Sequence, residues 1–201
     1  MASFTLIPHP DFPPLRVRGV SVELERNGSE TCLRYAVDGA DAVIWPAPAA
    51  PERADELWKA TCFELFVMPG EGAAYLEFNF SPSGRWAAYA FDAYRAGMHD
   101  LPLSADPKIE RSGHHIIIRH PGLEPGSIVP QAQPLEPPAP RLPPDGPWLK
   151  AGVTGPRIAL TAVIEETGGV RSFWALAHAP GAPDFHNPDC FVARLPAPDR
   201  A

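Results

Sequence analysis

The stretch "LWKATCFELFVMPGEGAAYLEFNFSPSGRWAAYAFDAY" (residues 57–94) decides the fold, because it reads as three strands separated by turns. Apolar and polar residues alternate along 61–68, 74–80 and 85–92, and a period of two is typical of strands that bury one face. Glycine and proline fall between these segments, where turns are expected. The stretch therefore predicts a run of neighbouring β-strands.

The turn "SPSG" (81–84) sets the predicted register of the second pair of strands. Its proline and glycine suit the second and fourth positions of a type I turn, which would place Phe80 opposite Arg85. In this register the pair has one polar face and one apolar core face. The polar face carries Glu77, Asn79 and Trp86, and the core face carries Leu76, Phe78, Phe80, Tyr89 and Phe91.

The strand before this hairpin adds to the polar face. Its odd-numbered positions from 63 to 67 are apolar, so Glu64 turns toward Glu77 and Asn79. Trp58 precedes Glu64 by six residues, an even number, and an extended chain would bring its indole to the same face. The sequence therefore predicts carboxyl groups, an amide and indoles on one surface.

Such a surface has the chemistry of a sugar-binding site. The C–H groups of a pyranose pack against an indole, and its hydroxyl groups need both donors and acceptors. Glu64 would accept hydroxyl protons while Arg85 donates, and charged groups form the stronger hydrogen bonds. The alternative is structural: Trp86 covers the sheet, Glu77 is a solvated strand residue, and a Glu–Arg pair links two strands.

The remainder of the chain also reads as β-structure. Six further segments combine β-branched or aromatic residues with flanking turn residues: 20–26, 32–38, 114–120, 158–166, 172–178 and 190–195. With the opening stretch they predict an all-β fold, an antiparallel β-sandwich (Ig-like or jelly-roll-like) of about nine strands, as a single domain over 1–201. Ten of the 27 prolines lie in 121–147, which predicts a Pro-rich loop insertion over 121–156.

Composition restricts the partners. The chain has 24 acidic and 17 basic residues and a formal charge of -7, which disfavours nucleic acid as a ligand. No apolar run is long enough to cross a membrane, and the start "MASFTLIPHPDFPPL" lacks the features of an export signal, so we expect a cytoplasmic protein with no membrane partner. Cys32, Cys62 and Cys190 form no CxxC pair and are expected to be buried free thiols.

Four segments carry a resemblance to a known family. The sequences "LWKATCFELFVMP", "AYLEFNFSPSGRWAAYAFDAYRAGM", "FWALAH" and "PDFHNPDCF" resemble the DOMON-like proteins related to family 9 carbohydrate-binding modules, over roughly residues 10–195. The resemblance implies a β-sandwich that binds a small carbohydrate. It also implies that Trp58 and Trp174 sandwich a terminal sugar, and that Glu64 and Arg85 bind its hydroxyl groups.

The strand pattern and the resemblance together give one set of expected ligand-binding residues. They are Trp58, Glu64, Glu77, Asn79, Arg85, Trp86 and Trp174. Sequence motifs of nucleotide binding, metalloprotease and serine-hydrolase chemistry are absent from the chain. We therefore expect a non-enzyme that binds a small carbohydrate or related polar ligand and needs no cofactor.

Three alternatives remain open at this point. Some DOMON domains hold haem iron between Met and His, for which this chain offers Met68, Met98, His178 and His186. The segment "PDFHNPDCF" (183–191) could instead form a metal or catalytic site from Asp184, His186, Asp189 and Cys190. A structural or protein-interaction domain without a small ligand is the third alternative.

Overall fold

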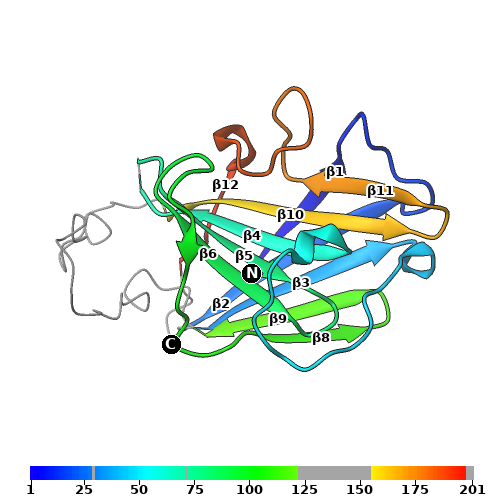
Figure 1. The fold of residues 1–201 in the computed structure, drawn as a ribbon, viewed down its shortest axis with the longest axis horizontal. Helices are drawn as coiled ribbons and strands as arrows, with labels where there is room; N and C mark the ends of the chain where they lie inside the picture. Colours follow the sequence, from blue (N-terminus) through cyan, green and yellow to red (C-terminus); the bar gives the residue numbers. More distant parts are fainter. Residues whose placement is uncertain (29, 71, 122–154, 198–201) are drawn as a thin grey trace.

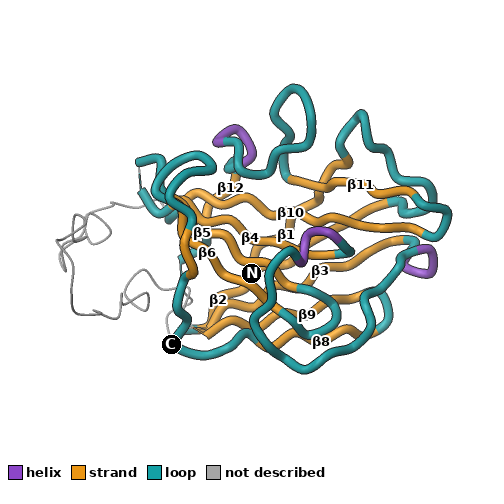
Figure 2. Tube along the Cα trace, viewed as in Figure 1, coloured by secondary structure: helices purple, strands orange, loops and turns teal. Residues whose placement is uncertain are grey.

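The computed structural model describes residues 1–28, 30–70, 72–121 and 155–197. Within them the chain forms twelve β-strands, three single-turn 3-10 helices and no α-helix (Figure 2). Most of the predicted Pro-rich loop, residues 122–154, lies outside the described residues. The prediction of an all-β fold is confirmed.

The strands and helices follow in chain order. The first half of the chain contains β1 (Ala2–Pro8), β2 (Gly19–Asn27), β3 (Glu30–Asp38), η1 (Ala40–Ala42), η2 (Leu57–Lys59), β4 (Cys62–Met68), β5 (Tyr75–Phe80) and β6 (Trp86–Phe91). The second half contains β7 (His99–Asp100), β8 (Lys108–Ser112), β9 (His115–Pro121), β10 (Arg157–Glu166), β11 (Val170–Ala175), η4 (Pro188–Cys190) and β12 (Ala193–Arg194).

Hydrogen bonds join the strands into one antiparallel path. Its order is β7-β6-β5-β4-β10-β11-β1-β2-β3-β9-β8, with β12 added beside β10 (Figure 1). Strand β1 is the corner of this path, because Ala2–Leu6 pair with β2 whereas Ile7 and Pro8 pair with β11. The antiparallel prediction is confirmed. A division into two separate sheets is not seen in the described part of the chain, because β1 connects the two halves of one curled sheet.

The two halves share a hydrophobic core. Side chains from β2, β3 and β9 form one buried cluster with those from β4, β5, β6 and β10. Tyr35 of β3 packs its ring against Phe63 of β4 and donates its hydroxyl to the backbone oxygen of Glu64, at 2.8 Å. Because each large apolar side chain buried here stabilises the fold by about 1.5–3 kcal/mol, this cluster holds the curled sheet closed.

The half formed by β4, β5, β6 and β10 is buried on both faces. In β2 every second residue is exposed or half-buried, as expected for a strand with one face in water, but all seven residues of β4 are buried. The outer face of β4 is covered by a second apolar cluster, to which the C-terminal segment contributes Phe185, Cys190 and Phe191. Polar residues that point outward from this half are therefore enclosed.

The predicted register of the β5–β6 hairpin is wrong by one residue. Phe80 pairs with Trp86, whereas the sequence pattern placed it opposite Arg85. The connection is one residue longer than a simple type I turn. The Ser81 backbone N–H donates to the Arg85 carbonyl, and Gly84 adopts a φ of 100° between these two residues. This extra residue turns Trp86 into the core and brings Tyr89 and Phe91 to the face of Glu77.

Not all of the nine predicted strands agree with the structure. Eight are confirmed, with ends that shift by a few residues. The predicted strand over 190–195 is confirmed only at Ala193–Arg194, which form β12. The preceding residues form η4, whose first residue is Pro188 and whose N-cap Asn187 accepts a hydrogen bond from the Asp189 amide. Strands β1, β7 and β8 were not predicted.

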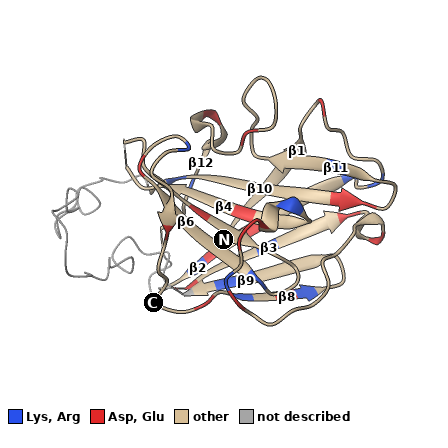
Figure 3. Cartoon of the chain, viewed as in Figure 1, with Lys and Arg blue, Asp and Glu red and all other residues tan. Residues whose placement is uncertain are grey.

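The described surface carries both signs of charge. In the view of Figure 3 the Lys and Arg residues are interspersed with Asp and Glu along the strands. No helix in the described residues is long and apolar enough to span a membrane.

Candidate functional site

The outer face of β4 and β5 contains a row of buried polar groups. Glu64 of β4 pairs across the sheet with Asn79 of β5 on one side and with Thr161 of β10 on the other. Glu77 lies one pleat further along β5, opposite Phe66. Because cross-strand partners share a face of the sheet, these polar groups gather as the sequence pattern predicted.

Glu64 is a carboxyl group removed from water. Its side chain is 2% exposed, and Oε2 accepts a 2.7 Å hydrogen bond from the Thr161 hydroxyl. Burial raises the pKa of Glu64 to about 8, with a further contribution from the negative charge of Glu77. The neutral, protonated form of Glu64 is therefore favoured at pH 7.

Glu77 and Asn79 form a hydrogen-bonded pair. Glu77 Oε1 accepts from Asn79 Nδ2 at 2.7 Å. Burial raises the pKa of Glu77, while the Asn79 amide and the Arg95 guanidinium oppose this rise. The other amide atom, Asn79 Oδ1, is buried and has no hydrogen-bond partner among the described residues. A buried acceptor without a donor is uncommon in folded proteins.

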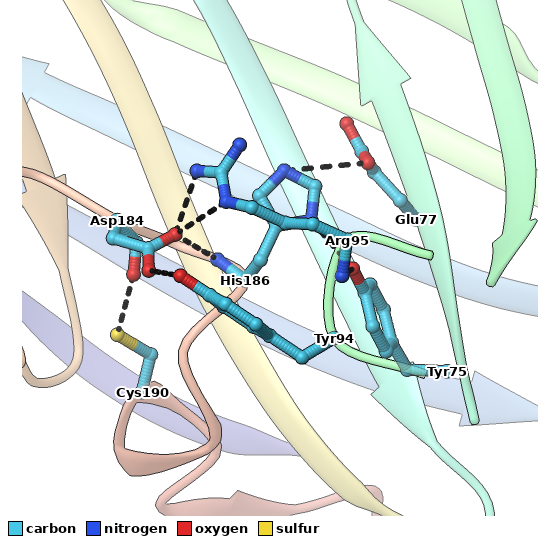
Figure 4. Close-up of polar contacts among 7 residues, drawn as sticks. All are labelled: Tyr75, Glu77, Tyr94, Arg95, Asp184, His186 and Cys190. Atoms are coloured by element: carbon cyan, nitrogen blue, oxygen red, sulfur yellow. Dashed lines mark hydrogen bonds and ion pairs between the residues drawn. The ribbon is translucent and has the colours of Figure 1, made fainter. Parts of the chain in front are cut away.

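His186 stands beside this pair, on the segment that crosses the outer face (Figure 4). Its Nδ1 lies 2.7 Å from the Tyr75 hydroxyl and its Nε2 lies 3.9 Å from Glu77 Oε2. The imidazole packs edge-on against the rings of Phe66, Tyr75 and Phe91. Burial lowers the pKa of His186 to about 4, and the Arg95 charge lowers it further, so the ring is neutral at pH 7.

Asp184 connects the His186 segment to the loop after β6. Its carboxylate accepts from both Arg95 Nε and Arg95 NH2 and from the Tyr94 hydroxyl, at 2.6–3.3 Å (Figure 4). These donors lower the pKa of Asp184 although its partial burial acts in the opposite direction. The backbone of Asp184 also accepts from the Cys190 thiol. Asp184 Oδ1 also accepts the His186 backbone N–H at 3.3 Å, so this carboxylate links the His186 backbone to the loop after β6.

Two of the predicted tryptophans lie in the core. Trp86 and Trp174 are 5% and 2% exposed and both belong to the cluster between the two halves of the sheet. The Trp174 indole donates to Ser172 Oγ at 2.9 Å. The Arg53 guanidinium covers one face of the Trp86 ring, 4.7 Å from its centre. In this structure neither ring offers a face to a ligand.

Trp58 and Arg85 are at the surface. Trp58 is 48% exposed on η2, a turn that contacts β4 and β5 and packs Leu57 into the outer cluster. Arg85 binds Glu52 through Nε and Nη2, and Glu64 is buried, so the structure does not bring these two expected ligand-binding residues together. The structure thus brings together Glu64, Glu77 and Asn79, places Trp58 on the turn beside them, and separates Arg85, Trp86 and Trp174 from them.

Several residues of this site were not expected to contribute to sugar binding. They are Tyr75, Tyr94, Arg95, Asp184 and His186. The first three lie in the opening stretch or directly after it, and the last two lie in "PDFHNPDCF", for which the sequence suggested only a metal or catalytic role. The two segments are almost 90 positions apart, so only the tertiary fold shows that they meet.

Three of the four residues of the haem alternative are engaged in internal contacts. Met68 Sδ contacts Arg157 NH2, and His178 Nε2 bonds the backbone oxygen of Ile7. His186 bonds Tyr75, and Met98 is exposed on the loop after β6. No group of three or more His, Cys, Asp or Glu in the described ranges is placed to hold a metal ion.

The chain matches no protein-family model and no curated protein. Among solved structures it is similar to a "putative carbohydrate-binding protein" from Bacteroides uniformis ATCC 8492, whose crystal structure was determined at 2.70 Å. The two have a TM-score of 0.56 and 17% sequence identity, over 94% of this chain and 84% of that chain. At this identity the similarity is one of fold.

Proposed function

We propose that this protein binds a small carbohydrate without transforming it, and that Glu77 is the ligand-facing carboxylate of its site. The observation that carries the proposal is the enclosed polar row on the outer face of β4 and β5. A folded chain gains nothing in stability from burying two carboxyl groups and an incompletely bonded amide there. A ligand rich in hydroxyl groups would supply the missing donors and acceptors.

The residues of the site take different roles toward such a ligand. Glu64 and Asn79 are both too deeply buried to meet a ligand directly and support Glu77 from behind. Glu77 keeps a small exposed area next to the half-buried His186. Trp58 is the exposed indole on the same side of the sheet and provides the stacking surface.

Two likenesses support this function. One is the resemblance of "LWKATCFELFVMP" and the hairpin sequence to DOMON-like proteins and family 9 carbohydrate-binding modules. The other is the fold shared with the Bacteroides uniformis protein, which is named a "putative carbohydrate-binding protein". Neither likeness supplies the identity of the sugar.

The test is a thermal-shift screen of neutral monosaccharides and disaccharides, since a ligand bound by the folded state alone raises the melting temperature. Sugars that shift the wild-type protein should shift Trp58→Ala and Glu77→Gln less. His114→Phe, on the turn between β8 and β9, serves as the control and should respond as the wild type does. If no sugar binds, the structural or protein-interaction role takes the place of this proposal.

A further inference from the structure

The facing atoms of His186 and Glu77 have an unused hydrogen-bonding capacity. His186 Nε2 and Glu77 Oε2 are 3.9 Å apart, beyond the range of a hydrogen bond. Glu77 uses its other oxygen, Oε1, to accept from Asn79. Within the described residues no hydrogen bond engages either of the two facing atoms. Their side chains are 17% and 8% exposed, so neither is completely shielded from the surface.

The position of the imidazole proton follows from the partners of Tyr75. The Tyr75 hydroxyl oxygen accepts the Arg95 backbone N–H at 3.3 Å and lies 2.7 Å from His186 Nδ1. We assign the Tyr75 proton to this second contact, because the described residues offer it no other acceptor. Since Nδ1 accepts, a neutral imidazole carries its proton on Nε2. His186 therefore presents an N–H donor toward Glu77.

The neutral state of this ring is consistent with its surroundings. Arg95 is the nearby cation, and Asp184, Glu77 and Glu64 are the nearby acids. Three aromatic rings pack against the imidazole and exclude water from it. Burial and Arg95 together hold the pKa of His186 near 4, whereas Asp184 acts weakly in the opposite direction.

We propose that His186 and Glu77 together bind a single hydroxyl group of a neutral sugar. The hydroxyl oxygen accepts from His186 Nε2–H and its proton is donated to Glu77 Oε2. The 3.9 Å between the two atoms suits one bridging oxygen at about 2.8 Å from each. This inference rests on the proposed function and specifies the class of sugar.

The pair selects against charged sugars at this point. A carboxylate cannot donate to Glu77 and would be repelled by it, and an ammonium group has no lone pair to accept from His186. Of the carboxylate, the ammonium group and the hydroxyl group, only the hydroxyl group can form both hydrogen bonds. The expected ligand is therefore a neutral polyhydroxy compound, and a uronic acid or amino sugar is disfavoured if its charge falls here.

The first measurement uses the ligand-free protein. Nitrogen-15 NMR of the histidine side chains should show His186 neutral, with the proton on Nε2, from pH 6 to pH 8. The His186→Phe variant assigns its signal and keeps an aromatic ring against Phe66 and Phe91. A proton on Nδ1, or an imidazolium at pH 7, would overturn the inference.

The second measurement is calorimetry with D-glucose, D-galactose and D-mannose, and with the uronate and the hexosamine of each. Loss of one of the two bonds in His186→Phe or Glu77→Gln should weaken binding of the preferred neutral hexose about tenfold. The double variant should lose less than the product of the two single losses, because both side chains act on one hydroxyl group. His114→Phe, on the turn between β8 and β9, should bind as the wild type does.

The outcomes separate the two proposals. Binding of a hexose that His186→Phe retains at full strength overturns the hydroxyl pair and leaves carbohydrate binding intact. If the wild-type protein binds none of the nine compounds, the proposed function fails together with this inference.

Discussion

Glu64 carries a proton that the unfolded chain would release. Its pKa of about 8 in the folded protein exceeds the ordinary value of 4.5, so between these pH values the folded state binds more protons than the unfolded state. Stability must then fall as the pH rises through this range.

We expect Glu64→Gln to flatten the pH dependence of stability. In the wild-type protein this one group lowers the free energy of unfolding by up to about 1.4 kcal/mol per pH unit between pH 5 and pH 8. Glutamine keeps the shape and accepts from Thr161, so the variant should lose this contribution and be the more stable protein at pH 8. Urea denaturation of both proteins at four pH values measures this pH dependence of stability. Parallel curves for the two proteins would show that Glu64 is ionised in the folded state.

At the scale of single residues the sequence was informative where a strand remains regular. The alternation along β4 and β5 correctly placed Glu64, Glu77 and Asn79 on one face. It misplaced Trp86 because the left-handed glycine of the hairpin adds one residue, and a single added residue reverses the faces of the following strand. His186 could not be assigned, since its partner Tyr75 lies 111 positions away.

The β5–β6 hairpin depends on Gly84. Its φ of 100° is unfavourable for any residue with a Cβ, although the added atom would meet only an ordinary contact with the Ala49 carbonyl. Gly84→Ala should therefore lower the free energy of unfolding by about 1–2 kcal/mol through backbone strain. Denaturant titration measures the loss.

Gly19→Ala is the matched control for this hairpin change. Gly19 opens β2 without a positive φ, and a Cβ added there would meet no atom within 4 Å, so alanine should be neutral or slightly stabilising. Equal losses of stability in the two variants would show that the left-handed conformation of Gly84 does not determine the register of the hairpin.

Glu166, at the end of β10, anchors the segment between β1 and β2. Its buried carboxylate accepts from the backbone amides of Leu15, Arg16 and Val17. Glu166→Gln turns an amide NH2 toward these donors, and we expect a loss of about 2–3 kcal/mol with faster hydrogen exchange at 15–17. Its neighbour Glu165 pairs with Arg171 near the surface, and Glu165→Gln should cost less than about 1 kcal/mol. Similar losses in both variants would contradict the anchoring role.

At the scale of elements, the strands that sequence reasoning missed are the short or exposed ones. β7 has two residues, and β8 has four exposed residues of five, so neither shows an apolar face. In β1 only Leu6 is buried, because this strand borders two others while most of its side chains remain near water. Periodicity in hydrophobicity detects burial, and these strands are defined by backbone hydrogen bonds.

At the scale of the molecule, one core holds both halves of the curled sheet, so they should unfold together. Leu6 of the corner strand is 2% exposed and belongs to that core. Leu6→Ala should cost about 2–5 kcal/mol while circular dichroism and tryptophan fluorescence keep a single common midpoint. Ile7→Ala, at the next and half-exposed position, should cost far less. Separate midpoints for the two signals would show that the halves are independent folding units.

The all-β class and most strands could be predicted from sequence, whereas the closure of the sheet could not. Closure depends on β1, which pairs within the same curled path with β2 and with β11. Local sequence carries no information on the second pairing, because Ile7 and its partner Ala175 are 168 positions apart (175 − 7). The sequence therefore predicted a sandwich of two sheets, whereas the described strands form one curled sheet.

The corner position of β1 also has a consequence for synthesis. A chain that leaves the ribosome from its N-terminus can pair β1 with β2 early, but the partner strand β11 is complete only at residue 175. Until then the hydrogen-bonding groups of Ile7 and Pro8 that face β11 have no strand beside them, and the core cluster lacks Trp174. For most of its translation the nascent protein thus has an unpaired β1 edge and an incomplete apolar core. We expect the pairing of β1 with β11 to form slowly and late, and the nascent chain to need chaperone protection before the last strands are made.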